Sequence, residues 1–323
     1  MPVSLQIPGD VLASASIDPG DVVVLNDRIP NWRLIVAGQP AVLKREWHLD
    51  TADIAWEHAF LTRLAATGFP APRPVPAFAG QSWIMLGGRL WTLVSYQPGH
   101  TLGWEERPDL GEVGRFIARY HAAVEGLEVA APRPLVPTIV ALAALAPWDR
   151  LEQTLQGPDG VQQFRGYLEQ TGDELAATGH AEARRLLIHG DFTTDNILVD
   201  GEPPTIVGAL DFALTTREVA LADLAFSLWR SGRSQPQAMA LHPDRVAALV
   251  AGYASCRSVP ATTARALPAY LKARGLQLIV RATHAGAPDC SPALERIAHI
   301  AAQQDQLQAV LARVLQTDHS SGA

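Results

Sequence analysis

The chain has 323 residues, of which 48% are hydrophobic, and its mean hydropathy of +0.06 is that of a globular protein with a substantial core. No run approaches the roughly 18 apolar residues of a membrane span, the first residues lack the pattern of a signal peptide, and two cysteines are too few for a disulfide framework, so we expect a cytoplasmic protein without membrane contact. The net charge of −7 argues against a nucleic-acid partner and mildly favours cationic ones.

The N-terminal part of the chain predicts an antiparallel sheet followed by a helix. Three short apolar segments within residues 20–47 are separated by RIPN and QP, which is typical of consecutive strands with tight connections. The helix is expected to begin at the acidic residues Asp50 and Asp53, because apolar residues at helical spacing follow them, and to end at Gly68.

A proline-rich segment and a hairpin complete this part. Residues 69–78 contain four prolines and predict an extended segment. The sequence IMLGGRLWTLVSYQPG then predicts a hairpin that turns at Gly87. Its second strand runs into a linker, which divides the chain into an N-terminal lobe of residues 1–97 and a C-terminal lobe of residues 98–323.

The C-terminal part predicts helices, because its apolar residues recur at spacings of three and four. One helix is expected to carry Asp223 alone among apolar neighbours, and a buried acid of this kind should be hydrogen-bonded. The expected helical segments are 109–127, 160–185, 219–232, 243–256, 262–282 and 292–316, and residues 136–148 are expected to form a core helix or a substrate-side insertion.

Two polar motifs carry the chemistry. Residues 187–198 read LIHGDFTTDNIL and residues 206–212 read IVGALDF, so two carboxylates and an amide lie on loops flanked by apolar strands. Phosphoryl transfer needs a carboxylate that accepts the proton of the attacking hydroxyl, a role that Asp191 fits. It also needs oxygen ligands for Mg²⁺, which Asn196 and Asp211 can supply. The motifs therefore indicate an ATP-dependent phosphotransferase with these three residues as its catalytic set.

HGDFTTDNIL together with LDFA resembles the superfamily of aminoglycoside phosphotransferases, choline kinases and homoserine kinases, which are small-molecule kinases. The resemblance implies an α+β, two-lobed protein-kinase-like fold with an antiparallel sheet in the N-lobe and a mostly helical C-lobe. It also implies ATP and Mg²⁺ as cofactors. The chain departs from the family pattern at residues 192–195, where a Leu-His-Pro-like stretch is usual, and at Ala213, where a glycine is usual.

The resemblance implies a nucleotide site in the N-lobe. Lys44 occupies the place of the strand lysine that holds the phosphates, and Glu57 that of the helix glutamate that positions this lysine. The linker residues Ser95, Tyr96 and Gln97 match the segment whose backbone bonds the adenine edge.

Three further features follow from the same comparison. His121 matches a position that packs inside the C-lobe, and Asp223 matches an acid that braces the backbone of the catalytic loop. The first turn of the sheet, NDRIPN, lacks the glycine or serine that often approaches the phosphates, although Arg28 or Asn31 could replace that contact through their side chains.

The expected acceptor is a small polar molecule. Only 11 residues separate Asp211 from Asp223 and no Ala-Pro-Glu element follows, so the activation segment of protein kinases is missing. The candidates are an aminoglycoside-like antibiotic, which would imply antibiotic resistance, an amino sugar, or an amino alcohol such as homoserine or choline. Four scattered acids are available for an amine-rich acceptor: Asp195, Glu218, Asp289 and Glu295. We expect a monomer or homodimer.

Two alternatives remain open on the residues alone. The motif around His189, Asp191 and Asn196 could be a hydrogen-bonded turn without catalytic purpose. The chain could also be a nucleotide-binding, pseudokinase-like module without turnover, because two glycines typical of such kinases are missing. No Walker, Rossmann, zincin or serine-hydrolase motif offers another class.

Overall fold

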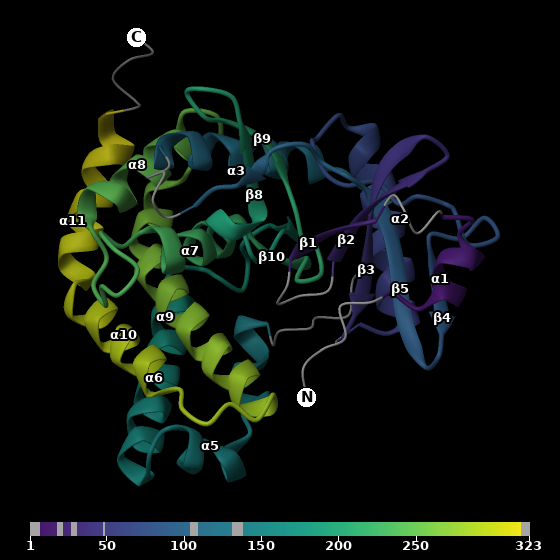
Figure 1. The fold of residues 1–323 in the computed structure, drawn as a ribbon. Helices are drawn as coiled ribbons and strands as arrows, with labels where there is room; N and C mark the ends of the chain where they lie inside the picture. Colours follow the sequence, from purple (N-terminus) through teal and green to yellow (C-terminus); the bar gives the residue numbers. More distant parts are fainter. Residues whose placement is uncertain are drawn as a thin grey trace.

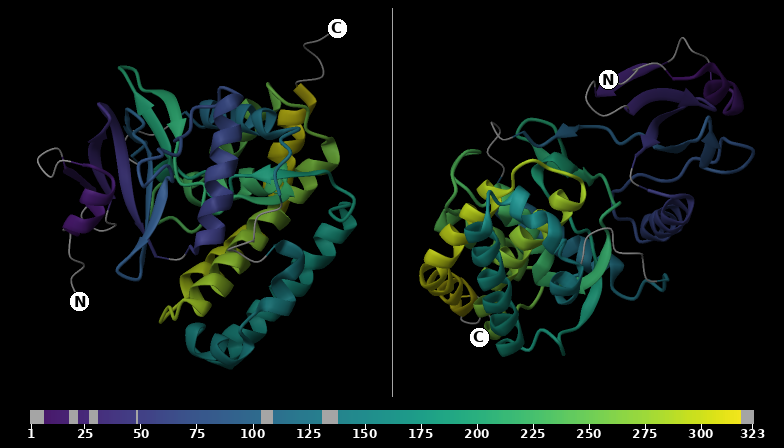
Figure 2. Two further views of the ribbon diagram at one scale, coloured as in Figure 1. Left: turned by 90° about the vertical axis from the view of Figure 1, so that its right-hand side faces the viewer. Right: turned by 90° about the horizontal axis from the view of Figure 1, so that it is seen from below.

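The computed structural model describes residues 7–17, 22–26, 31–47, 49–103, 109–130 and 138–317. Figure 1 shows a sheet in purple and blue on one side of the molecule and a helical part in teal to yellow on the other. The two further views in Figure 2 show the same separation. This arrangement confirms the predicted α+β architecture of an antiparallel sheet followed by helices.

Five antiparallel strands form the sheet, in the order β1-β2-β3-β5-β4. Their bounds, with those of the short helix before them, are α1 (Gly9–Ser14), β1 (Val23–Asn26), β2 (Asn31–Val36), β3 (Gln39–Glu46), β4 (Trp83–Leu86) and β5 (Arg89–Ser95). The predicted hairpin turns at Gly87 and Gly88, which both have positive φ, as a tight hairpin turn requires. The NDRIPN turn with Arg28 lies outside the described residues.

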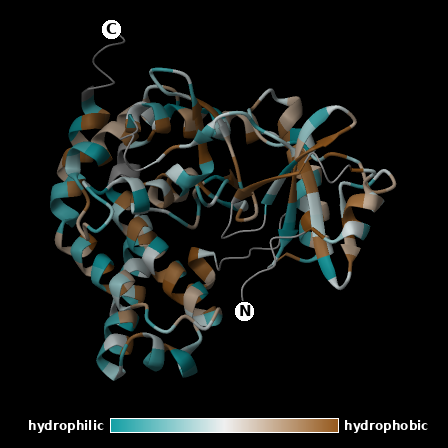
Figure 3. Ribbon diagram, viewed as in Figure 1, coloured by the Kyte–Doolittle hydropathy of each residue, from teal (hydrophilic) through white to brown (hydrophobic). Residues whose placement is uncertain are grey.

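The sheet has a small hydrophobic core of its own. Trp32 on β2 and Trp91 on β5 are buried, and their rings lie 5.8 Å apart. Val11 of α1 packs into the same cluster, so α1 covers one face of the sheet. In contrast, the apolar side chains of β1 are exposed, and Figure 3 shows this strand as a hydrophobic stretch.

Helix α2 (Thr51–Ala66) follows strand β3 and packs against the helical part. It begins as predicted, because the Asp50 side chain accepts hydrogen bonds from the backbone of Ala52 and Asp53 while Asp53 caps the Asp50 N–H in return. Its apolar residues pack into the larger cluster of the helical part, where the Phe60 ring lies 6.0 Å from that of Phe212.

The helical part contains two small sheets that flank the polar motifs of the sequence, in the orders β6-β8-β9 and β10-β7. The bounds are β6 (His100–Thr101), α3 (Leu110–Val124), η3 (Ile139–Ala141), α4 (Leu142–Leu145), α5 (Trp148–Thr154), α6 (Pro158–Ala177), β7 (Arg185–Ile188), η4 (Thr194–Asn196), β8 (Ile197–Asp200), β9 (Thr205–Ala209), β10 (Thr216–Val219), α7 (Ala220–Ser231), α8 (Pro243–Ala254), α9 (Ala261–His284), α10 (Ser291–Ala302) and α11 (Gln304–Thr317). In the described ranges, no helix is both long and apolar enough to span a membrane.

Two predicted helix boundaries were wrong. The segment 160–185 ends as a helix at Ala177, and its last residue already belongs to strand β7. The segment 292–316 is two helices rather than one, because the chain breaks at Gln303. The Gln303 side chain accepts a hydrogen bond from the Leu241 N–H and donates one to the Leu241 carbonyl, which fixes the break against a distant loop.

Candidate active site

The loop between β7 and β8 brings Asp191 and Asn196 together. The side-chain amide of Asn196 donates to the Asp191 carbonyl at 2.9 Å and to the Asp191 carboxylate at 3.1 Å. The Asp191 side chain keeps 27% of its surface exposed, so it remains accessible. A carboxylate that is oriented by an amide and open on one side is suited to accept a proton from a bound hydroxyl.

Asp223 braces this loop from helix α7, as predicted. Its carboxylate accepts the backbone N–H groups of His189 at 2.9 Å and of Gly190 at 2.8 Å. It also contacts the Nε2 atom of His121 at 2.9 Å, and His121 is fully buried, which confirms the predicted structural role of that histidine. The catalytic loop is therefore held through its backbone by a buried acid.

His189 is a structural residue of the loop. Its Nε2 donates to the Leu210 carbonyl at 3.0 Å, and its Nδ1 accepts the Asp191 N–H at 3.2 Å, so the two bonds define one neutral tautomer. Burial lowers the pKa of His189, which keeps the ring neutral. The ring also stacks on Phe192 at 4.2 Å.

Asp211 follows β9 in a backbone conformation that is unusual for a residue other than glycine, with φ of 59°. The Leu210 N–H donates to the Asn196 carbonyl at 2.8 Å, which ties the Asp211 segment to the catalytic loop. Ala213 does not share the positive φ. The alanine in place of the usual glycine is thus accommodated, because the left-handed position is that of Asp211 itself.

Lys44 on β3 and Glu57 on α2 interact electrostatically with Asp211. Burial lowers the pKa of Lys44, but the carboxylates of Asp211, Glu46 and Glu57 outweigh it and the net shift is upward. Burial raises the pKa of the Glu57 carboxyl to about 8, against the attraction of Lys44. Three carboxyl groups therefore act electrostatically on one ammonium group, which places Lys44 near Asp211.

The linker residues lie directly after β5, where part of their hydrogen bonding is already used. The Ser95 N–H donates to the Arg73 carbonyl at 2.7 Å and the Tyr96 N–H to the Pro40 carbonyl at 3.1 Å. The Gln97 side chain donates to the Ser95 hydroxyl at 3.1 Å. These bonds fix the linker but leave its role toward adenine a prediction.

One residue near Asp191 was not predicted from the sequence. Arg274, in the middle of α9, donates to the Asp191 carboxylate at 3.3 Å, and its guanidinium lies over the Phe226 ring at 4.1 Å. Nothing in the sequence around it signals this contact, since α9 lies far along the chain from the catalytic loop.

Residues 23–259, more than half of the chain, match the profile of the family described as the Phosphotransferase enzyme family. The chain belongs to this family. The match confirms the resemblance found in the HGDFTTDNIL and LDFA motifs, and it covers the sheet and the catalytic loop.

Similar proteins carry several kinase names. The phosphotransferase is 28% identical to a homoserine kinase of Methylobacterium radiotolerans over 239 residues, which are 71% of this chain and 68% of that protein. It is 28% identical to a homoserine kinase of Agrobacterium fabrum over 252 residues, 77% of this chain and 74% of that protein. A solved microcompartment-associated aminopropanol kinase shares its fold with a TM-score of 0.72 at 17% identity, covering 94% of this chain and 97% of that one.

The residues proposed for Mg²⁺ in the phosphotransferase offer suitable donors. Because the nitrogen of the Asn196 amide is bonded to Asp191, its oxygen is left for a cation, and the exposed Asp211 carboxylate follows on the adjoining segment. Oxygen donors of this kind suit Mg²⁺. No group of three or more His, Cys, Asp or Glu residues arranged for a metal occurs in the described ranges.

The four acids considered for an amine-rich acceptor do not gather in the described structure of the phosphotransferase. Asp195 pairs with Arg230. Asp289 accepts the backbone N–H of Ser291, and Glu295 lies beside a histidine of its own helix. Glu218 alone of the four lines the cavity next to the catalytic loop.

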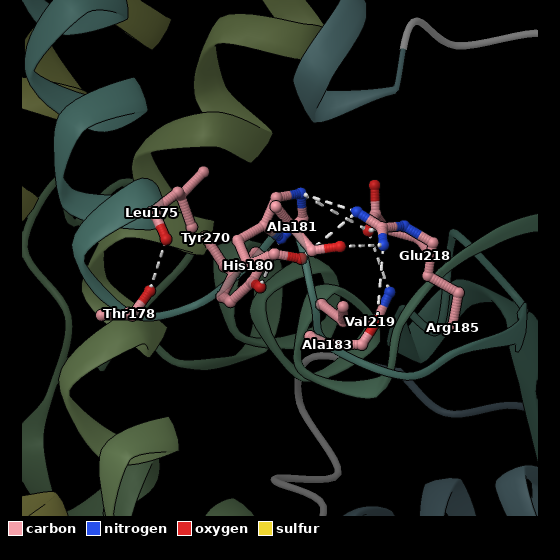
Figure 4. A network of polar contacts seen from close by, with 9 residues as sticks. All are labelled: Leu175, Thr178, His180, Ala181, Ala183, Arg185, Glu218, Val219 and Tyr270. Carbon is pink, nitrogen blue, oxygen red and sulfur yellow. Dashed lines mark hydrogen bonds and ion pairs between the residues drawn. The ribbon is translucent and has the colours of Figure 1, made fainter.

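Glu218 belongs to a buried polar network, which Figure 4 shows in detail. Its carboxylate accepts the Val219 N–H at 2.9 Å and lies 3.8 Å from the Arg185 Nε atom. Next to them, the His180 Nδ1 atom and the Tyr270 hydroxyl lie 2.7 Å apart. The charge of Glu218 is therefore partly neutralised within the protein.

Proposed function

We propose that this phosphotransferase moves the γ-phosphate of ATP to a hydroxyl of a small polar molecule, with Asp191 as the base. The observation that carries the proposal is the Asp191 carboxylate itself. It is held by Asn196 and Arg274 and stays partly exposed, and both Arg274 and the neighbouring residue Gly190 line a small cavity. An oriented carboxylate at the edge of a small cavity suits proton abstraction from an alcohol.

The nucleotide side of the proposal uses both parts of the chain. Lys44 would hold phosphate oxygens and Glu57 would position it, while residues 95–97 would bond the base at the junction of an N-lobe and a C-lobe. Asn196 and Asp211 would hold Mg²⁺, which, when bound, offsets the charge on the phosphates. Asp191 would orient the acceptor hydroxyl toward the γ-phosphorus and receive its proton.

The acceptor is better described as a metabolite than as a polycationic antibiotic. The two homoserine kinases cover most of the chain, and the four acids that an aminoglycoside would need do not gather. A protein that only bound nucleotide would not need the Asp191 carboxylate held by Asn196 and Arg274, which favours turnover. The binding module without turnover therefore remains the second proposal.

The first prediction concerns the base. Asp191→Asn removes the proton acceptor but keeps the shape, so we expect acceptor-dependent ADP release to fall by about 10²- to 10⁴-fold while Mg·ATP binding persists. Asp195→Asn is the matched control, because it makes the same change in the same loop at an exposed residue, and it should stay within a few-fold of the wild type. Normal turnover in Asp191→Asn would rule out this base; no turnover in the wild-type protein with any acceptor would favour the binding module.

A further inference from the structure

Arg274 is buried at the cavity beside the catalytic loop. Only 5% of its side chain is exposed, and it lines the cavity together with Gly190 and Phe226. Burying a guanidinium removes it from water, and this burial lowers the pKa of Arg274 to about 10 despite the attraction of Asp191. A charge held there needs hydrogen-bond partners to offset the lost hydration.

The described protein provides few such partners. Nη2 of Arg274 donates to Asp191 at 3.3 Å, but the buried Nε and Nη1 atoms have no hydrogen-bond partner within the described ranges of the chain. A guanidinium carries five donors in a planar fork that matches a carboxylate, and buried donors are almost always bonded. The unpaired donors therefore point to an oxygen acceptor on a ligand.

The charges of the cavity favour an anionic group that is accompanied by a cationic one. Arg274 supplies a positive charge to this lining, and Glu218, on β10, supplies a negative charge that Arg185 neutralises only in part. Gln277, one turn after Arg274 on α9, adds a polar side chain. A polycationic acceptor would meet the buried guanidinium without compensation, whereas a small zwitterion matches both charges.

We propose that Arg274 binds the carboxylate of the acceptor, so that the phosphotransferase acts on a hydroxy amino acid in preference to the corresponding amino alcohol. The inference rests on the proposed kinase function and extends it to one substrate class. Arg274 would hold the carboxylate while the hydroxyl at the other end of the acceptor reaches Asp191, and Asp191 would then share its ion pair with the bound substrate.

The test uses pairs of acceptors that differ by one carboxyl group: serine with ethanolamine, homoserine with 3-aminopropan-1-ol, and threonine with 1-aminopropan-2-ol. We expect the wild type to prefer the amino acid of at least one pair in kcat/KM. In Arg274→Gln this preference should fall by roughly 10- to 100-fold, mainly through KM of the amino acid, because a charge-assisted hydrogen bond is lost. Arg274→Lys should retain part of the preference.

Two controls separate recognition from other effects. Arg265→Gln removes the same charge from an exposed position on the same helix and should leave the preference unchanged. Melting curves of the Arg274 variants show whether the fold persists, and Arg274→Lys keeps the charge if the glutamine variant does not fold.

The outcomes distinguish the inference from the function. If Arg274→Gln lowers kcat/KM equally for both members of each pair, Arg274 only positions Asp191 and the inference is overturned. ADP release with the amino alcohols but not with the amino acids would also overturn it, while the kinase function would stand. ADP release with none of the six acceptors, from a protein that binds Mg·ATP, would count against the function and the inference together.

Discussion

Gly190 places the backbone of the catalytic loop against the segment that follows Asp211. Its φ is +79°, and a Cβ atom at this position would lie 2.3 Å from the Leu214 carbonyl oxygen. No other residue fits without moving one of the two segments. The HGD motif thus combines a buried neutral histidine, a glycine required by close packing, and one acid that stays accessible for chemistry.

Buried histidines make the stability of the protein depend on pH. Burial lowers the pKa of His58 from 6.5 to about 4, and its Nδ1 atom lies 2.6 Å from the Ser82 hydroxyl. The unfolded chain therefore binds a proton between pH 6.5 and 4 that the folded protein does not. The contribution of His58 to the free energy of unfolding is fully present above this window. It is lost as the pH falls through the window, by at most about 3 kcal/mol.

The second prediction follows from the direction in which stability changes with pH. His58→Gln removes the titrating group, so the free energy of unfolding should change less between pH 7 and pH 5 than in the wild type. Urea unfolding at the two pH values measures it. The remaining slope belongs to other groups, including His180 and His189, whose pKa values are also lowered by burial. An unchanged slope in the variant would show that His58 is not the group responsible.

The sequence indicated some residues of the candidate site and could not indicate others, for a physical reason. Asp191, Asn196 and Asp211 stand out because polar residues at fixed spacing interrupt apolar strands. Arg274 does not, since it lies 83 residues after Asp191 on a helix, and the sequence does not show which helical residues face a cavity. Lys272 is also buried on the same helix, but it pairs with Glu174. Burial alone would therefore not have shown which of the two residues contacts Asp191.

Helices α3 and α8 cross where glycines allow their backbones to touch. A Cβ atom on Gly252 would lie 2.0 Å from the Gly111 carbonyl oxygen, and one on Gly114 would lie 2.1 Å from that of Leu249. This close crossing lets Tyr253 reach His121, whose Nδ1 atom lies 2.9 Å from the tyrosine hydroxyl. The helix crossing thereby supports the histidine that contacts Asp223.

The third prediction tests this crossing. Gly252→Ala should destabilise the protein by about 3 kcal/mol, because the new methyl group overlaps backbone that cannot move independently. Gly172→Ala on helix α6 is the matched control, since nothing lies near its Cβ position. There the higher helix propensity of alanine should stabilise by up to about 1 kcal/mol. Denaturant midpoints measure both, and equal effects of the two substitutions would contradict the role given to the crossing.

Element boundaries were predictable where local chemistry marks them. Helix α2 begins at Asp50 because the acid caps it, and the β4-β5 hairpin turns at two glycines. The break between α10 and α11 has no glycine or proline, and it depends on the bonds between Gln303 and Leu241, 62 residues apart. Tertiary contacts of this kind override local propensity and are not visible in a pattern of apolar residues.

At the scale of the whole molecule, the two hydrophobic cores do not coincide with the two lobes that the sequence predicts on either side of residue 97. The smaller core belongs to the sheet and α1, whereas Phe60, Leu61 and Leu64 of α2 pack into the larger core of the helical part. Helix α2 therefore packs with the helical part, while its Glu57 interacts electrostatically with Lys44 of the sheet and with Asp211. The division at residue 97 stays a prediction, and a nucleotide bound as proposed would contact residues on both sides of it.

This arrangement leads to the last prediction. A ligand that contacts both parts stabilises the folded state by about 2.7 kcal/mol at 100 times its Kd. We expect Mg·ATP to raise the Tm of the wild type more than ATP with a chelator does, because Asn196 and Asp211 contribute only when the metal is bound. Asp211→Asn should lose the Mg²⁺-dependent part of the shift and keep the part due to metal-free ATP. Asp200→Asn, an exposed residue at the end of neighbouring strand β8, should keep both. If Asp211→Asn reduces the two shifts equally, Asp211 acts on the nucleotide or on Lys44 rather than as a metal ligand, and the metal would have to be held from the nucleotide phosphates and Asn196.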